Sequence, residues 1–288
     1  MTGFGNRDEY GPSERPLMRL EHPKSGKFQQ GSLFNCVLVP GYEGCPCHGL
    51  VLTARCDLEH GKSSVVNYLP VVRFSDWAKR EMCFLLARRI HKSVQGTINK
   101  ALSDKKVTKF VLDTFPLRTI IEKETSGRDR ENLLAKLVQL QVIEAVISLG
   151  GRHTSQSSEL IQIDGKHCDT LIRELIQGKL SEYYFIDAVD IYEQSVEGYV
   201  VQLRNMRMLN TEHASKIVAG LEQESARSDA GLMSVLTFAH EPICMITGVL
   251  RSPDIEHLAQ CFANLFVRIG LEDHEDQTIE HHQNIAKG

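Results

Sequence analysis

The chain has 288 residues, of which 42% are hydrophobic and 24% charged, and its formal net charge at pH 7 is -4. A chain of this size and composition can bury a large core without disulfide bonds. The negative charge argues against broad non-specific binding to nucleic acid, which depends on a basic surface. No apolar run reaches the roughly 18 residues of a membrane-spanning helix, and charged residues stand where a signal peptide would be apolar. We therefore expect a cytoplasmic protein without a membrane partner.

The N-terminal part of the chain is predicted to be an arm followed by short strands. Residues 1–30 mix glycine, proline and charged residues without periodicity, so we expect a flexible arm. Three runs rich in valine and leucine follow, each bounded by glycine, proline or polar residues. This pattern is typical of strands, which we place at residues 32–40, 50–56 and 65–74.

After residue 74 the apolar residues recur at three- and four-residue spacing, which predicts a long helix capped by Ser75 or Asp76. A second long helix is predicted over residues 128–149 and a shorter one over 168–177, whereas 109–117 is ambiguous. The predicted apolar face of the first helix is Cys83, Leu86, Ala87, Ile90, Val94, Ile98 and Leu102, and that of the second is Leu134, Leu137, Val138, Val142, Ala145, Val146 and Leu149.

The C-terminal part returns to strands and ends in a helix. Residues 183–192 and 199–209 concentrate β-branched and aromatic side chains and are predicted strands. A short helix capped by Thr211 follows, then a hairpin over 232–250. Ser252 is expected to cap the last helix, which ends at Gly270. The polar, His-rich residues 271–288 are expected to be disordered.

These elements predict an α+β fold with a small curved β-sheet or SH3-like barrel, a large helical insertion over about residues 75–180 and a C-terminal helix. The spacing shows no linker between independent domains. We therefore expect one domain over residues 31–270, preceded by the arm and followed by the tail.

Four of the eight cysteines lie within the 21 residues from Cys36 to Cys56. In an extended segment Cys45 and Cys47 point the same way, and His48 and Cys56 are close in sequence, so a Cys3His zinc site is one interpretation. Cys36 or His60 could substitute for one ligand. The alternative is that these cysteines are small buried apolar residues. Disulfides are not expected in a reducing compartment.

The same segment allows an enzymatic interpretation, with Cys56 as nucleophile. Arg55 would favour the thiolate, His60 could act as base, and Asp57 could orient the histidine or act as acid and base. Neighbours in sequence are seldom partners in a catalytic triad, and the alternative role of Asp57 is to cap the turn that follows it.

Two stretches resemble a family of bacterial proteins. Residues 49–58, Gly-Leu-Val-Leu-Thr-Ala-Arg-Cys-Asp-Leu, followed by Tyr-Leu-Pro-Val-Val at 68–72, are similar to the pattern VLTQxCDL…PV, with Ala54 in place of the glutamine. The C-terminal pattern SPxxEHLxQxFAxxFxRVGL is matched at Ser252, Pro253, Glu256, His257, Leu258, Gln260, Phe262, Ala263, Phe266, Arg268, Ile269, Gly270 and Leu271. This uncharacterised bacterial family has no assigned activity, and its genes are often found near mobile elements and antiviral defence genes.

The order of the first strands is also similar in outline to the SH3-like barrel of MazF/PemK toxins, which cleave RNA, although the catalytic residues do not match. Two hypotheses follow. The favoured one is a non-catalytic binding or regulatory subunit of a bacterial antiviral defence or toxin-like system, with a partner protein and with zinc as an optional structural element. The alternative is an RNA- or nucleotide-directed enzyme that uses Arg55, Cys56, Asp57 and His60.

Overall fold

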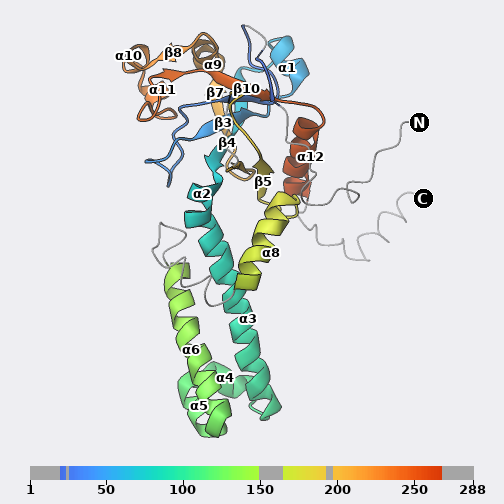
Figure 1. Ribbon diagram of the computed structural model, residues 1–288, viewed down its shortest axis with the longest axis vertical. Coiled ribbons are helices and arrows are strands. Elements are labelled where there is room, and N and C mark those ends of the chain that lie inside the picture. The colour runs from blue at the N-terminus through green and yellow to red at the C-terminus, as the bar shows by residue number, and fades with distance from the viewer. Residues whose placement is uncertain (1–19, 24–25, 149–164, 193–196, 268–288) are drawn as a thin grey trace, which may run out of the picture.

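A curled antiparallel sheet with a long helical arm makes up the molecule (Figure 1). The computed structural model describes residues 20–23, 26–148, 165–192 and 197–267. The strands are β1 (Leu20–Glu21), β2 (Ser32–Phe34), β3 (His48–Val51), β4 (Val65–Arg73), β5 (Tyr183–Ile186), β6 (Tyr199–Gln202), β7 (Arg207–Asn210), β8 (Leu221–Glu222), β9 (Ile243–Cys244) and β10 (Ile246–Leu250). The helices are α1 (Arg55–Glu59), α2 (Phe74–Trp77), the π-helical turn η2 (Ala78–Met82), α3 (Cys83–Asp104), α4 (Lys109–Thr114), α5 (Leu117–Glu124), α6 (Gly127–Ser148), α8 (Gly165–Ile176), α9 (Thr211–Val218), α10 (Gln223–Ala226), α11 (Ala230–Met233) and α12 (Asp254–Val267).

The main sheet has the order β1-β10-β2-β3-β4-β6-β5, and all its pairs are antiparallel. The central strand β4 pairs with β3 along one edge. Along the other edge its first part pairs with β7 and its last part with β6. Pro70 lies where β4 changes partner, a place where a residue without an N–H is tolerated. The sheet curls into a half-barrel, which we call the body together with the elements packed on it.

Both faces of the sheet are covered. Neighbouring residues of its strands point to opposite sides and belong to two separate core clusters. One face belongs to a large core cluster that contains Phe34, Tyr68 and Trp77 and continues between the helices of the arm. The other face belongs to a smaller cluster in which α12 contributes Ile255 and Leu258. At Gly49 the two strands and the Phe34 ring approach so closely that a Cβ would lie 2.4 Å from that ring.

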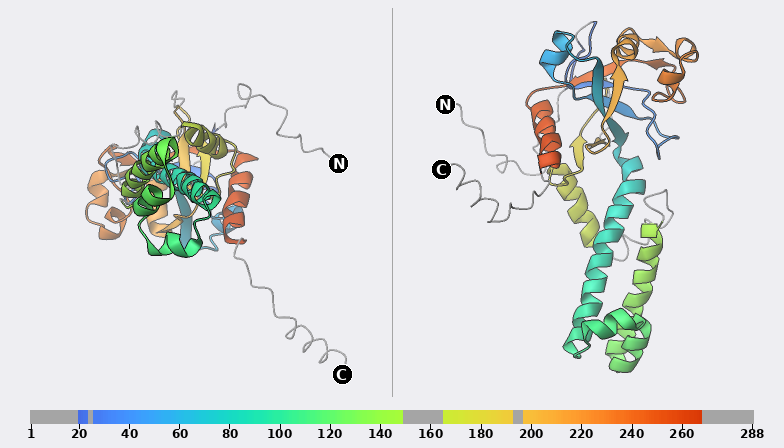
Figure 2. Two further views of the ribbon diagram at one scale, coloured as in Figure 1. Left: turned by 90° about the horizontal axis from the view of Figure 1, so that it is seen from below. Right: turned by 180° about the vertical axis from the view of Figure 1, so that it is seen from behind.

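The helical arm, made of α2, η2, α3, α4, α5 and α6 and called the arm from here on, leaves the body directly after β4 (Figures 1 and 2). α2, η2 and α3 form one helical run, α4 and α5 close the far end, and α6 returns beside α3 in the opposite direction. α8 then leads back along the root of α3 to β5, and Arg89 forms an ion pair of 2.5 Å with Glu174 there. Of the described helices, none is long and apolar enough to cross a membrane.

The predicted fold class is confirmed: the protein is α+β with a curved sheet, and helices follow β4 as expected. The apolar face predicted for α3 is buried as a whole. The face of α6 is shifted, since Leu133, Leu140 and Ile143 are buried and Val138 is exposed. Apolar residues occur on several sides of α6, so the helical spacing of apolar residues alone did not identify its buried face.

Several strand predictions were too long. The run 32–40 forms a strand only over β2, and 50–56 leaves the sheet after Val51 because the next residues turn into α1. The run 199–209 is two strands, β6 and β7, that pair with different parts of β4. In the ambiguous segment 109–117, residues 109–114 form α4, Phe115 is extended, and α5 begins at Leu117.

The predicted hairpin over 232–250 is wrong, because β9 pairs with β8 while β10 pairs with β1 and β2. Asn210, rather than Thr211, caps α9 by accepting a hydrogen bond from the His213 N–H at 2.7 Å. The N-terminal segment 1–30, predicted to be flexible, includes residues that the structure places in β1. Most of that segment, Gly270 and the tail 271–288 lie outside the described residues.

Candidate functional site

The segment predicted to carry catalysis is a surface helix. β3 ends at Val51. Two residues later, Thr53 Oγ1 accepts the Asn67 N–H at 2.7 Å, and α1 begins at Arg55. Cys56 is exposed, and its Sγ lies 3.6 Å from Asp57 Oδ1. The His60 N–H closes the helix on the Cys56 carbonyl at 3.2 Å. Cys56 therefore sits on a helix rather than at a strand end, and the side-chain contact shown within the predicted set is to the carboxylate of Asp57.

Arg55, Leu58 and Glu59 border a wide cavity of about 560 Å³ between α1 and the segments around Phe28 and Arg251. Arg251 is held there by an ion pair with Glu21, in which Nε and Oε1 are 2.7 Å apart. The motif segment thus lines a surface hollow with one face, while Cys56 is exposed at its side.

The four predicted zinc ligands are not assembled into one set. Cys45 and Cys47 are buried, whereas Cys56 is exposed on α1. Burial raises the pKa of the Cys45 thiol and raises that of Cys47 to about 12. Among the residues that the structure describes, no group of three or more His, Cys, Asp and Glu side chains is placed to hold a metal ion. The zinc site stays a prediction.

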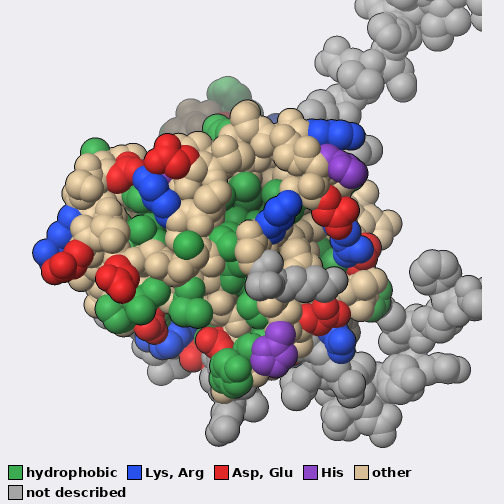
Figure 3. Space-filling view, turned by 90° about the horizontal axis from the view of Figure 1, so that it is seen from above, with side chains coloured by type: hydrophobic (Ala, Val, Ile, Leu, Met, Phe, Trp, Pro, Cys, Tyr) green, Lys and Arg blue, Asp and Glu red, His purple; other side chains and the backbone are tan. Residues whose placement is uncertain are grey.

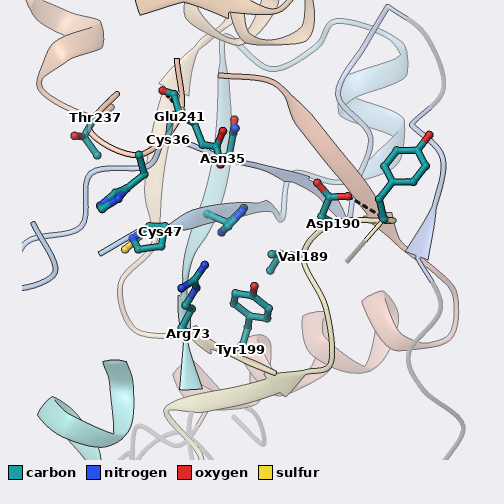
Figure 4. A pocket seen from close by; sticks show the side chains of 13 residues that line it. Asn35, Cys36, Cys47, Arg73, Val189, Asp190, Tyr199, Thr237 and Glu241 are labelled. Carbon is teal, nitrogen blue, oxygen red and sulfur yellow. Dashed lines mark hydrogen bonds between the residues drawn. The ribbon is translucent and has the colours of Figure 1, made fainter. Parts of the chain in front are cut away.

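A second cavity of about 310 Å³, here called the polar cavity, lies in the body where β3, β4 and β6 meet the loops around residues 190 and 240. Figure 4 shows how its side chains converge from these separate segments. The residues that line it include Asn35, Cys36, Cys47, His48, Arg73, Val189, Asp190, Tyr199, Thr237 and Glu241.

His48 is held neutral in the wall of this cavity. Burial, followed by the positive charge of Arg73, lowers the pKa of His48 to about 4. Its Nδ1 is buried and has no hydrogen-bond partner among the residues that the structure describes, while its ring packs edge-on against the Tyr199 ring at 5.9 Å between centroids. A buried N–H without an acceptor costs more than a buried lone pair. The neutral ring is therefore expected to carry its proton on Nε2.

Opposite charges border the polar cavity from two sides. Arg73 and Tyr199 extend from β4 and β6 into the space that Asp190 and Glu241 border from the other side (Figure 4). Arg73 forms no ion pair among the described residues, and Asp190 Oδ1 accepts the Tyr192 N–H at 2.8 Å. A guanidinium binds carboxylates or phosphates, and the two carboxylates bind amines or N–H groups. The cavity suits a small polar molecule with an acceptor group at one end and a donor group at the other.

Cys36 fixes the floor of this cavity. Its φ is 63°, in the left-handed region that residues other than glycine rarely adopt. Its Sγ lies 3.7 and 3.6 Å from the carbonyl oxygens of Glu241 and Ile243, and its own carbonyl accepts the Thr237 N–H at 2.8 Å. These contacts hold a strained residue in place, as is common where a loop is positioned for binding.

Sequence reasoning identified His48, but as a zinc ligand, and it missed Arg73, Asp190, Tyr199 and Glu241. Arg73 stood at the end of an apolar run, a position that a strand end explains equally well. The two acidic residues lie in segments predicted as strands. The fold of the sheet and its loops brings these four residues to one cavity, so no local sequence pattern marked them.

The far end of the arm carries a different kind of surface. α4 has no buried residue, and Phe110 on it is 74% exposed. Phe115, which follows α4, is 52% exposed. Lys106 and Lys109 are exposed beside them. We call Phe110, Phe115, Lys106 and Lys109 the arm tip.

No protein-family model, no curated protein and no solved structure matches this chain.

Proposed function

We propose that this chain is a non-catalytic binding subunit that recognises a partner protein through the arm tip, and that it serves a bacterial antiviral defence or toxin-like system. The arm tip carries the first part of the proposal. The similarity of residues 49–58 and of the C-terminal helix to the bacterial family supports the second part, since genes of that family are often found beside defence genes.

Exposed aromatic side chains on a projecting element favour a protein partner. Exposed apolar patches commonly mark interaction surfaces, and large aromatic side chains are frequent anchors of protein interfaces. The tip presents two exposed phenylalanines, Phe110 on α4 and Phe115 directly after it. Lys106 and Lys109, which are exposed in the same segment, favour a partner that carries acidic side chains beside its apolar contact.

The end of the body opposite the arm gives no support to a nucleic-acid partner. On this face acidic and basic side chains are interspersed around apolar ones (Figure 3). Binding to a phosphate backbone depends on a continuous basic face. RNA therefore stays a prediction of the alternative hypothesis.

The proposal is tested by photo-crosslinking in the cell that makes the protein. A photoreactive residue at position 113, which is exposed on α4, should capture one dominant partner. The matched control is the same residue at position 138, because Val138 is also an exposed apolar residue of the arm but lies away from the tip. Adding Phe110→Glu and Phe115→Glu should remove the product at 113 while the melting temperature stays unchanged.

Equal products from positions 113 and 138, or a product at 113 that survives both substitutions, would contradict the proposal. A crosslinked product made of two copies of this chain would also contradict it, because the arm tip would then bind a second copy rather than a different protein.

A second candidate function rests on the polar cavity, where Arg73 faces Asp190 and Glu241. Such a site could bind a small polar molecule as a regulator or as a substrate of an enzyme. Thermal-shift screening of the parent against Arg73→Ala tests this candidate. A ligand that stabilises the parent and not the variant would support it.

A further inference from the structure

Three side chains of the body form a connected polar set away from both cavities. Cys261 Sγ lies 3.8 Å from His257 Nε2, and His257 Nδ1 lies 2.9 Å from the Tyr184 hydroxyl oxygen. A thiol, an imidazole and a third group that holds the imidazole are the parts of an activated cysteine. We propose that Cys261 is a reactive thiol that undergoes exchange with small disulfides, with His257 as its proton acceptor and Tyr184 as a positioning residue.

The fold fixes this geometry from two elements. His257 and Cys261 are four residues apart on α12 and therefore lie on the same face of the helix. Tyr184 comes from β5, is almost fully buried, and packs its ring against the imidazole at 5.4 Å between centroids. The imidazole is thus held by a neighbour on each side, with one nitrogen toward the hydroxyl and the other toward the sulfur.

Tyr184 can select the reactive tautomer of His257. When the Tyr184 oxygen accepts a hydrogen bond from Nδ1–H, Nε2 carries the lone pair and faces the thiol. Nε2 can then take the thiol proton, and the imidazolium that results stabilises the thiolate.

The exchange step balances without a further reactant. The Cys261 proton moves to His257 Nε2, and the thiolate attacks one sulfur of the small disulfide. A new bond forms between that sulfur and Cys261 while the original S–S bond breaks. The other half leaves as a thiolate and takes the proton from the imidazolium. The products are a mixed disulfide at Cys261 and one free small thiol.

The remaining cysteines provide an internal comparison. Six of the eight are buried, Cys56 is exposed and Cys261 is partly exposed. Cys56 faces the carboxylate of Asp57 rather than an imidazole. Exposure alone would make Cys56 react faster, whereas activation by His257 would make Cys261 react faster.

The test is the rate of mixed-disulfide formation at each cysteine in the reduced full-length protein at pH 7, with glutathione disulfide as the probe and peptide mass spectrometry as the readout. We expect Cys261 to react about tenfold faster than Cys56. His257→Gln keeps a polar group beside Tyr184 but cannot accept the proton, and it should slow Cys261 about tenfold with Cys56 unchanged. Tyr184→Phe should slow Cys261 by a smaller factor.

If His257 only stabilised the packing of α12, His257→Gln would have the opposite effect: it would loosen the helix, expose the sulfur of Cys261 and raise its reaction rate. The proposal is overturned if Cys261 reacts no faster than Cys56 in the parent, a comparison that needs no variant. It is also overturned if His257→Gln leaves the rate at Cys261 unchanged or raises it.

Discussion

The body and the arm are stabilised in different ways. In the body, strands distant in sequence pair directly, as when β10 joins β1 to β2, so its geometry depends on contacts across the whole chain. In the arm, α3 and α6 pack through side chains that repeat along each helix, and the connecting helices are local. Elements built from local contacts can open without the rest. The body is therefore suited to hold a preformed cavity, and the arm to present a surface.

The largest effect is expected where the two regions join. Trp77 is fully buried in α2, with its ring 5.9 Å from that of Phe74 and 5.3 Å from that of Tyr183. Trp77→Ala removes a large side chain shared by the body and the arm root, and should lower the free energy of unfolding by about 4 kcal/mol. Urea unfolding measures the loss. A loss below about 1 kcal/mol would mean that the two regions are not coupled through this residue.

A substitution within the arm should have a smaller and more local effect. Ile98 is fully buried in α3, and Ile98→Ala should cost about 3 kcal/mol. Amide hydrogen exchange should accelerate in α3 and α6 and stay unchanged in β4. The matched control is Val138→Ala on the exposed side of α6, which should change little. Equal acceleration in β4 would show that the arm does not open on its own.

His48 gives the body a pH-dependent stability. Its pKa falls from 6.5 to about 4 on folding, so the unfolded chain takes up the proton first as the pH decreases. Its stabilising contribution is complete above about pH 6.5 and is lost as the pH falls toward 4. Between pH 7 and pH 5 the parent should lose about 2 kcal/mol more than His48→Asn.

Urea unfolding of both proteins at the two pH values gives this difference. The same loss in parent and variant would mean that His48 is not kept neutral by the fold.

The smallest effect is expected at Asp57. Its carboxylate lies in the first turn of α1, where it interacts favourably with the positive end of the helix. Asp57→Asn should lower stability by less than about 1 kcal/mol and leave crosslinking from the arm tip unchanged. If the variant instead lost a biological activity at full stability, the enzyme hypothesis for Arg55, Cys56, Asp57 and His60 would be favoured.

The same difference between the regions explains what could be predicted from the sequence. The inner face of α3 was predictable because Ile90, Val94 and Ile98 repeat at helical spacing. The strand ends were not, because the departure of the chain after Val51 depends on its pairing with β4. The polar cavity was not predictable for the same reason. Arg73 and Glu241 line one cavity only because the sheet and its loops bring distant parts of the chain together.

The most direct test of the partner-binding account is hydrogen exchange of this protein alone and in complex with the protein captured from position 113. The account predicts that protection appears in α4 and at Phe115, with no change in α1 or around the polar cavity. Protection of α1 without protection of the arm tip would contradict it, and would place the binding surface on the segment that contains Cys56 and Asp57.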